Sequence, residues 1–379
     1  ISTQVNSLNT KDTEAGAYIA FTATGLDKNI DSLIKVIKTS MESTRLDEES
    51  RIKQIIFDGI RSFRQSLSEM GHSWSLMEMQ KNWSKTAQFK SKISGKEIYE
   101  HYEMIYDLLN DKSTEHVVFD NLKRVMGYLK EMPLILSVAS DNPEKHMNLY
   151  KTHFKDYSGW SSIKGINLNI SSDPVGENTV FSGKTNVNYL QSVWKAPSYK
   201  EENAGVVSVI AKILSNEFVH KTIREKGGAY GAGAYYNQDG ALIMSSYRDP
   251  KLLSTYNSFN DAAQWINSNT ITNEMVEAAI IGISRDLDSP LPPKKSVQVS
   301  WSHLRNGLTF EDREKYRKEI FSTTPEKVKE VALQIFSNPP LSKTGFINES
   351  KEDEAKNGGL TVIPLTVPLT EFKQKQKKP

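Results

Sequence analysis

The sequence predicts an α+β protein of two similar layered domains, in which mainly antiparallel sheets pack against helices. The chain has 379 residues, roughly twice the length of an ordinary domain. Strand patterns and amphipathic helices occur in both halves of the chain. A strand, an aspartate, a helix, a break and a second helix also occur twice in the same order. These observations favour two copies of one α+β unit.

The repeat is clearest at its two aspartates. Asp27 follows Thr24-Gly-Leu, and Asp249 follows Ser246-Tyr-Arg. Each aspartate stands before a helix whose N-terminus it is expected to cap. The repeat therefore predicts two related domains, the first of which lacks its opening strands. A chance match is the alternative interpretation, because this order of elements is common.

The first half is predicted to be mostly helical and to form a domain over residues 1–157. Gly71-His72 is expected to end its second helix. Residues 158–177 are polar, lack periodicity and contain the turn signal Asp173-Pro-Val-Gly176, so they form the predicted linker. The expected elements are strands over 16–24 and 133–138 and helices through 30–37, 52–63, 74–79, 96–110, 116–131 and 142–155.

The second half, residues 178–379, is predicted to begin with strands and to continue with helices. A capping box, Ser198-x-x-Glu201, is expected to start a helix that Gly227-Gly228 ends. A hairpin then turns at Asn237-Gln-Asp-Gly240. The other expected elements are strands within 179–194 and 345–347 and helices that begin after Asp249-Pro250, at Thr272 and over 295–306, 310–321 and 325–337.

Composition narrows the function classes. With 48 basic and 46 acidic side chains, the net charge of +2 gives no field that favours nucleic acid or an acidic membrane. No apolar run approaches the about 20 residues that span a bilayer. Cysteine is absent, which excludes disulfides, thiolate metal sites and cysteine nucleophiles. The chain begins at Ile1 and shows no targeting pattern, so we expect it to be part of a longer polypeptide. The cytoplasm and an organelle lumen such as the mitochondrial matrix are both compatible with the sequence.

The seven histidines do not form a zinc motif. A helical zinc site needs two histidines one turn apart with a carboxylate between them. Glu100-His101 would need a histidine at position 97, and Glu115-His116 would need one at position 112; these positions hold glutamate and lysine. His146 and His153 lie two turns apart, too far for one ion. The sequence therefore predicts no metal in this chain.

The glycine-rich stretch Gly228-x-x-Gly231-x-Gly233 resembles a phosphate-binding loop only in composition. Such loops follow a strand and precede a helix, whereas here a helix comes first and a strand follows. We expect the glycines to let an extended peptide approach this strand and add to the sheet edge. Nearby, Arg224 and Tyr230 are suited to hydrogen-bond the oxyanion of a tetrahedral intermediate. The alternative is an arginine at a helix end and a tyrosine packed in a sheet.

The stretch Ile223-Arg-Glu-Lys-Gly-Gly-Ala-Tyr-Gly-Ala-Gly233, followed by Ser246-Tyr-Arg-Asp-Pro250, closely resembles the C-terminal half of presequence proteases. These form subfamily C of the pitrilysin/insulinase (M16) group of zinc metallopeptidases. Gly25-Leu-Asp-Lys-Asn29 and Gly71-His72 extend the resemblance over most of the chain. In this family, four similar α+β domains form two bowl-shaped halves that enclose a peptide chamber. The resemblance implies that this chain is the third and fourth domains.

The resemblance also assigns the candidate site. It implies that Tyr230 donates to the oxyanion and that Arg224 orients the peptide or the tyrosine, so these two are the predicted catalytic residues. The inverted His-x-x-Glu-His zinc motif belongs to the first family domain, so zinc is expected in the N-terminal half of the parent enzyme and no cofactor in this chain. The residues expected to bind substrate or line the chamber are Glu225, Gly228, Ala229, Gly231 and Tyr247.

The implied function is the substrate-binding half of a zinc endopeptidase that hydrolyses short unstructured peptides. Its partners are then the N-terminal half of the same polypeptide and peptide substrates, and the chain is inactive alone. The alternative is a non-catalytic scaffold or assembly subunit of the same fold. The presence of both Arg224 and Tyr230 beside the glycine strand favours the peptidase half, because a scaffold needs neither.

Overall fold

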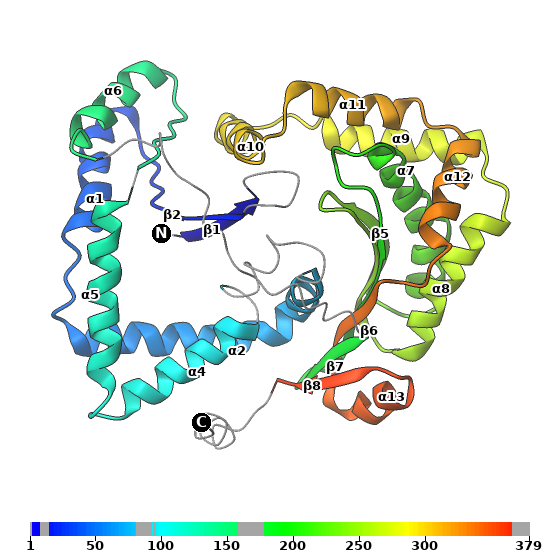
Figure 1. Cartoon of the computed structure of the whole chain (residues 1–379), viewed down its shortest axis with the longest axis horizontal. Coiled ribbons are helices and arrows are strands. Elements are labelled where there is room, and N and C mark those ends of the chain that lie inside the picture. The colour runs from blue at the N-terminus through cyan, green and yellow to red at the C-terminus, as the bar shows by residue number, and fades with distance from the viewer. Residues whose placement is uncertain are drawn as a thin grey trace. The chain divides into compact units, whose positions relative to one another are not determined.

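The structure, a computed structural model, describes residues 2–7, 15–80, 93, 96–132, 134–157 and 178–365. The chain forms two compact units, whose elements are labelled in Figure 1. Unit 1 comprises Ile1–Arg64, Lys92–Asn169 and Pro290–Gly307, and unit 2 comprises Gln65–Ser91, Ile170–Ser289 and Leu308–Pro379. The predicted linker at 158–177 lies outside the described residues, so the domain boundary stays a prediction.

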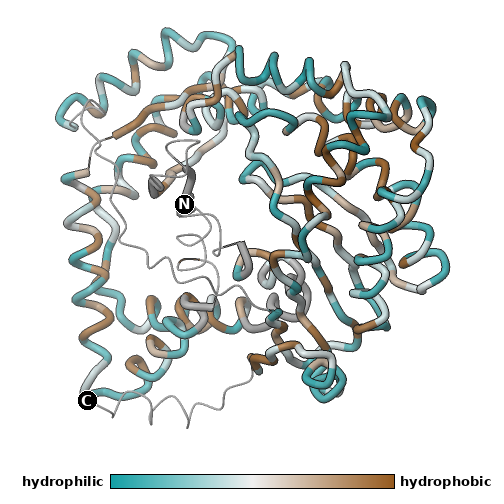
Figure 2. The backbone as a smooth tube through the Cα atoms, turned by 45° about the vertical axis from the view of Figure 1, so that its right-hand side comes forward, coloured by the Kyte–Doolittle hydropathy of each residue, from teal (hydrophilic) through white to brown (hydrophobic). Residues whose placement is uncertain are grey.

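Unit 1 combines a hairpin with helices. Strands β1 (Ser2–Ser7) and β2 (Ala15–Ala20) pair antiparallel. Strand β1 was not predicted, because its residues are mostly polar and lack an apolar alternation. The helices of this unit carry alternating brown and teal segments in Figure 2, as amphipathic helices do. They are α1 (Ile30–Glu42), the first half of α2 (Glu49–Gln80), α4 (Lys96–Asn110), α5 (Glu115–Glu131), α6 (Pro143–His153) and α10 (Pro293–Arg305), with the short helix η1 (Asp27–Asn29) before α1.

Two predictions about the first half are wrong. Helix α2 runs unbroken over Glu49–Gln80, so Gly71-His72 does not end it. A glycine inside a helix costs about 1 kcal/mol, a penalty that tertiary packing readily offsets. The strand expected over 133–138 is also absent from its described residues: Leu134 forms a single bridge, and Leu134 and Leu136 pack against a core around Ile34 of α1.

The two aspartates of the sequence repeat do not cap helices. Asp27 makes no capping bond to η1, and its carboxylate lies beside Lys145 and His146 of α6. Asp249 accepts hydrogen bonds from the Lys251 backbone N–H (2.8 Å) and the Thr255 hydroxyl (2.9 Å), but it lies several residues before α8 begins. Both carboxylates are used for contacts within their own unit, so the expected capping role is wrong for both.

Unit 2 is built on a six-stranded sheet in the order β5-β6-β4-β7-β3-β8. The pairs β5–β6, β6–β4 and β4–β7 are antiparallel, and β3 runs parallel to β7 and β8. This confirms the predicted mainly antiparallel sheet, and β5 is one of its two edges. The strands are β3 (Thr179–Gly183), β4 (Asn188–Lys195), β5 (Gly231–Asn237), β6 (Ala241–Asp249), β7 (Ser342–Asn348) and β8 (Thr361–Pro364).

Helices cover one face of this sheet, with α7, α8, α9 and α12 on the same side in Figure 1. Helix α7 is apolar on almost every side and is buried, as expected for a central helix. It begins at Ala204, later than predicted: Glu201 does accept from the Ser198 N–H (2.6 Å), but Asn203 has a φ of 70° that interrupts the helix. The helices are α7 (Ala204–Leu214), α8 (Leu253–Ser268), α9 (Asn273–Leu287), α11 (Phe310–Phe321), α12 (Pro325–Phe336) and α13 (Glu352–Asn357), with η3 (Glu349–Lys351).

The side chains on the two faces of the sheet belong to different hydrophobic clusters, because side chains alternate between the faces along each strand. Toward the helices, Leu190 and Leu242 join the main core, which also holds α7 and α8. On the opposite face, Val193 and Ile243 are fully buried and contact Leu76 from the end of α2. Among the described residues, no helix is long and apolar enough to cross a bilayer.

Candidate functional site

The candidate site begins where α7 changes its winding. The helix continues over Ser215–Glu225 as a π-helix, η2, in which the Lys226 N–H donates to the Lys221 carbonyl (3.2 Å). Such five-residue spacing is rare and occurs frequently at functional sites. In the π-helix, Val219 and Ile223 are buried, while Arg224, near its C-terminal end, is exposed. The π-helix was not predicted, because its apolar spacing also fits an α-helix.

The paired glycines end η2 sharply. Gly228 has a φ of +86°, which favours glycine, and its N–H donates to the Arg224 carbonyl (3.0 Å). The Ala229 N–H donates to the Ile223 carbonyl (3.2 Å). A side chain at Gly227 would collide with that same carbonyl. The turn therefore needs both glycines, as predicted, and it delivers the chain directly to Tyr230.

Arg224 is held from within its own helix. Its Nη1 lies 3.2 Å from Nε2 of His220, and the His220 Nδ1 lies 3.2 Å from Oε1 of Glu225. Because a guanidinium can only donate, Nε2 of His220 accepts and Nδ1 carries the proton that faces the carboxylate. His220 therefore bridges Glu225 and Arg224. The sequence reasoning missed His220, although its position four residues before Arg224 is the signal that would have found it.

Tyr230 projects into solvent beside a second aromatic ring. The residue is 69% exposed, and its hydroxyl has no hydrogen-bond partner among the described residues. Its ring centroid lies 6.2 Å from that of Tyr247, and the Arg248 guanidinium lies 5.9 Å from the same ring. The phenol is thus available as a hydrogen-bond donor, while the ring that carries it contacts two neighbours.

Arg248 also lies at the site, although it is not among the predicted catalytic or substrate-binding residues. Its φ is +50°, which is uncommon for a residue with a side chain. Its guanidinium lies 5.6 Å from the Tyr247 ring, and Tyr247 packs edge-on against the buried Tyr189 at 5.1 Å. A hydrogen bond with Tyr189, and the nearby Tyr247, raise the pKa of Arg248 above its ordinary value. The guanidinium is therefore anchored to the end of the sheet that carries Tyr230.

The structure brings some of the predicted residues together and separates others. Gly231 pairs across the strands with Tyr247, so these two lie beside Tyr230. Ala229 is buried in the main core, which keeps its side chain away from the surface. At Gly233, a Cβ atom would lie 3.0 Å from Oγ of Ser215, so the space beside this glycine is taken by the chain's own π-helix.

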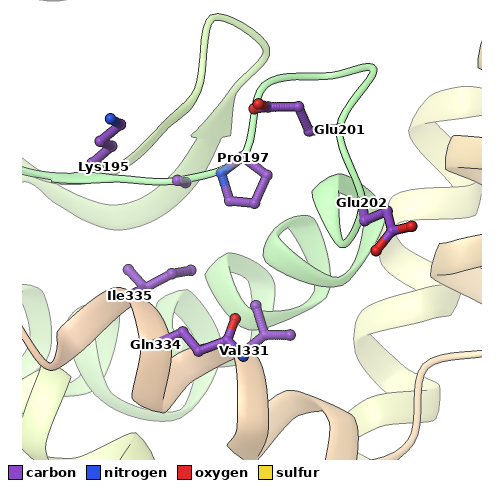
Figure 3. Close-up of a pocket in the computed structure, with 8 residues that line it drawn as sticks. Lys195, Pro197, Glu201, Glu202, Val331, Gln334 and Ile335 are labelled. Carbon is purple, nitrogen blue, oxygen red and sulfur yellow. The ribbon is translucent and has the colours of Figure 1, made fainter.

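A surface pocket of about 340 Å³ lies elsewhere on unit 2. Figure 3 shows it between the segment from Lys195 to Glu202 and the side chains of Val331, Gln334 and Ile335 on α12. Lys195 pairs with Ala241 at one end of β4, whereas the Arg248 end of β6 runs beside the other end of β4. The pocket and Tyr230 therefore lie at opposite ends of the sheet, and the pocket is not part of the candidate site.

The described residues do not fit a metal site. No three of their histidines, aspartates and glutamates come together as a group that could hold an ion. His220, the histidine of the candidate site, already faces a guanidinium, and a second cation there would be repelled.

Two known protein families match the chain. Residues 178–338 match the family described as PreP C-terminal domain, and residues 1–108 match a family described as associated with the C subfamily of peptidase M16. The mitochondrial presequence protease of Yarrowia lipolytica is 24% identical over 328 residues, which cover 84% of this chain and 32% of that protein. The chain spans about a third of the length of the curated relatives it matches.

Solved structures share the fold. Pitrilysin matches 94% of this chain and 37% of its own with a TM-score of 0.57 and 13% identity. The inactive domain of a peptidase M16 from Pseudomonas fluorescens matches 84% of this chain and 75% of its own with a TM-score of 0.53 and 12% identity. These neighbours confirm the predicted α+β class of the pitrilysin type.

Proposed function

Because the chain belongs to the presequence protease-like peptidases of the M16 group, we propose that it is the substrate-binding half of a zinc endopeptidase that hydrolyses short unstructured peptides. The N-terminal half of the same polypeptide holds the zinc and activates the water. The two halves close around the peptide in one chamber. In this proposal, residues 1–157 form the third family domain, 158–177 the linker and 178–379 the fourth.

The observation that carries the proposal is the exposed hydroxyl of Tyr230 on a ring that Tyr247 and Arg248 contact. Peptide hydrolysis builds negative charge on the carbonyl oxygen of the scissile bond, and a preorganised donor aimed at that oxygen lowers the barrier. A phenol that has no partner among the described residues gives up no hydrogen bond to them when it donates to substrate. Tyr230 therefore serves as the oxyanion donor.

Arg224 and the edge strand provide the positioning. The guanidinium of Arg224, held by His220, binds a substrate carbonyl and limits the approach of the peptide. Strand β5 is an edge of the sheet, and its outer backbone groups can pair with an extended peptide. Gly231, beside Tyr247, leaves room for substrate side chains at the start of this edge.

Reconstitution tests this function. The chain, produced alone, is expected not to cleave a fluorogenic unstructured peptide, and mixing it with its N-terminal half is expected to restore cleavage that a zinc chelator abolishes. Cleavage by the chain alone would contradict the proposal.

A matched mixture separates the peptidase half from a scaffold. The chain that carries both Arg224→Ala and Tyr230→Phe is expected to bind the N-terminal half as wild type does and yet to restore little activity. Full activity in this mixture would favour the scaffold, because a scaffold acts through its shape and not through these two side chains.

A further inference from the structure

We propose that Arg248 is a positioning residue for Tyr230: its guanidinium, placed over the Tyr230 and Tyr247 rings by a left-handed backbone, directs the Tyr230 hydroxyl toward the substrate. This inference rests on the proposed role of Tyr230 as the oxyanion donor. Arg248 orients the Tyr230 hydroxyl and does not itself contact the peptide.

The contacts of the guanidinium bridge two rings. It lies 5.9 Å from the centroid of Tyr230 and 5.6 Å from that of Tyr247, both within the range of cation–π attraction. The two rings are 6.2 Å apart and inclined by 58°. A tyrosine that is 69% exposed would otherwise sample several rotamers. The Arg248 guanidinium, which contacts both rings, restricts the rotamers of Tyr230.

The left-handed backbone conformation of Arg248 indicates that its side chain has a role at this position. A residue with a Cβ atom at a φ of +50° carries backbone strain. Glycine would adopt this conformation without that cost. The contacts around Arg248 offset this cost, and those of its side chain are with Tyr189, Tyr230 and Tyr247.

The strained residue is tied down on both sides. On one side, its own carbonyl accepts a hydrogen bond from the Tyr230 N–H at 3.3 Å. On the other, Asp249 is buried, its carboxylate accepts from Thr255, and its carbonyl accepts from the Asn188 side chain at 3.0 Å. The backbone and the ring of Tyr230 are thus both fixed to one residue, which is itself fixed to the sheet.

The chemistry favours arginine over other cations here. A guanidinium is planar, so it can lie against two aromatic faces and still donate to the Tyr189 hydroxyl in its own plane. Lysine would keep the charge but not the planar stacking. The substitution Arg248→Lys therefore separates the effect of the planar guanidinium from the effect of the positive charge.

The test measures kcat and KM in the reconstituted two-half peptidase for Arg248→Gly, Arg248→Lys, Tyr230→Phe and the double variant Tyr230→Phe/Arg248→Gly. Arg248→Gly is expected to lower kcat about 10-fold, because a misdirected donor loses preorganisation, and to leave KM within about 2-fold. Arg248→Lys is expected to be nearly as slow. The double variant is expected to be no slower than Tyr230→Phe alone, because Arg248 acts through the Tyr230 hydroxyl.

The matched control is Arg313→Lys, which changes an arginine that lies 5.8 Å from the Phe310 ring on α11. It is expected to leave kcat and KM unchanged. If Arg248→Gly does not fold, as judged by thermal unfolding, Arg248→Lys and Tyr230→Phe/Arg248→Lys replace it in the comparison.

Two results would overturn the inference while the proposed function stands: wild-type kcat in both Arg248 variants, or losses that multiply in the double variant. Multiplied losses would mean that Arg248 acts independently of the Tyr230 hydroxyl. An unchanged kcat in Tyr230→Phe alone would instead overturn the role of Tyr230 itself, and this inference with it. The two failures are therefore distinguishable in one set of measurements.

Discussion

Nη1 of Arg224 donates to Nε2 of His220 across 3.2 Å, four residues earlier in the same π-helix. This bond requires His220 to be unprotonated at Nε2, and Glu225 faces the opposite nitrogen. The direction of the Arg224 side chain therefore depends on His220. In the proposed function, His220 does not contact the substrate.

His220→Ala is expected to lower kcat/KM of the reconstituted peptidase about 5-fold, since one hydrogen bond that orients Arg224 is worth about 1 kcal/mol. His220→Gln is expected to recover most of the loss, because its amide oxygen accepts and its amide nitrogen donates. Lys221→Ala, at the exposed neighbour that pairs with Glu217, is the control. Equal activity of the Ala and Gln variants would argue against an orienting role.

Gly205→Ala is expected to destabilise unit 2 by roughly 1–3 kcal/mol, the usual range for overpacking. An added Cβ would lie 2.6 Å from the Tyr316 carbonyl and 2.7 Å from Cβ of Glu319, so α7 and α11 would have to separate. Gly282→Ala is the matched control in the same unit. Its Cβ would meet only the flexible end of Lys212, and the gain in helix propensity, about 1 kcal/mol, offsets that contact. Urea unfolding compares the two, and equal stability would show that α7 and α11 are not closely packed.

The stability of unit 2 is expected to fall above pH 10. Burial, with the nearby Tyr316 as a second cause, raises the pKa of Tyr199 to about 12, and burial also raises the pKa of Tyr256, whose hydroxyl donates to the Thr344 carbonyl at 2.6 Å. Between pH 10 and 12 the unfolded chain loses these protons while the folded chain keeps them. Stability is therefore complete below pH 10 and is lost as the pH rises.

Tyr256→Phe tests this directly. At pH 7 the variant is expected to lose about 1 kcal/mol with its hydrogen bond, and its unfolding free energy should then fall less steeply between pH 10 and 11 than that of the wild type. Parallel curves for the two proteins would show that Tyr256 does not contribute to the alkaline transition.

The end of α2 is expected to protect the face of the sheet opposite the helices. Leu76 packs against Val193 and Ile243, so Leu76→Ala should cost about 1–2 kcal/mol and speed the amide exchange of β4 and β6. Ile55→Ala, in the same helix but 56% exposed, is the control. Unchanged exchange in Leu76→Ala would show that this contact does not stabilise the sheet.

Elements with strong local signals were predictable from the sequence. Helices α4, α5, α11 and α12 lie within about two residues of their predicted bounds, because apolar spacing and capping residues such as Thr324 act locally. The hairpin turn at Asn237–Gly240 is confirmed for the same reason, and Gly240 has a φ of +96°.

Other features depend on contacts that a sequence pattern does not contain. Helix α2 continues through Gly71-His72, and the carboxylates of Asp27 and Asp249 find partners outside helix N-termini. The left-handed conformation of Arg248 likewise has no signal in Ser246-Tyr-Arg-Asp-Pro250. His220 was not singled out from the sequence, and Arg248 was not assigned a role of its own, because the roles of both come from their neighbours in space.

The central claim is that the Tyr230 hydroxyl is the donor to the oxyanion, and single-turnover cleavage by the reconstituted peptidase with Tyr230→Phe tests it most directly. The variant keeps the ring, which contacts Tyr247 and Arg248, and removes only the hydroxyl. The rate of the chemical step is expected to fall about 100-fold while peptide binding stays within about 2-fold, the pattern of a lost transition-state donor. A Phe variant that cleaves at the wild-type rate would contradict this claim.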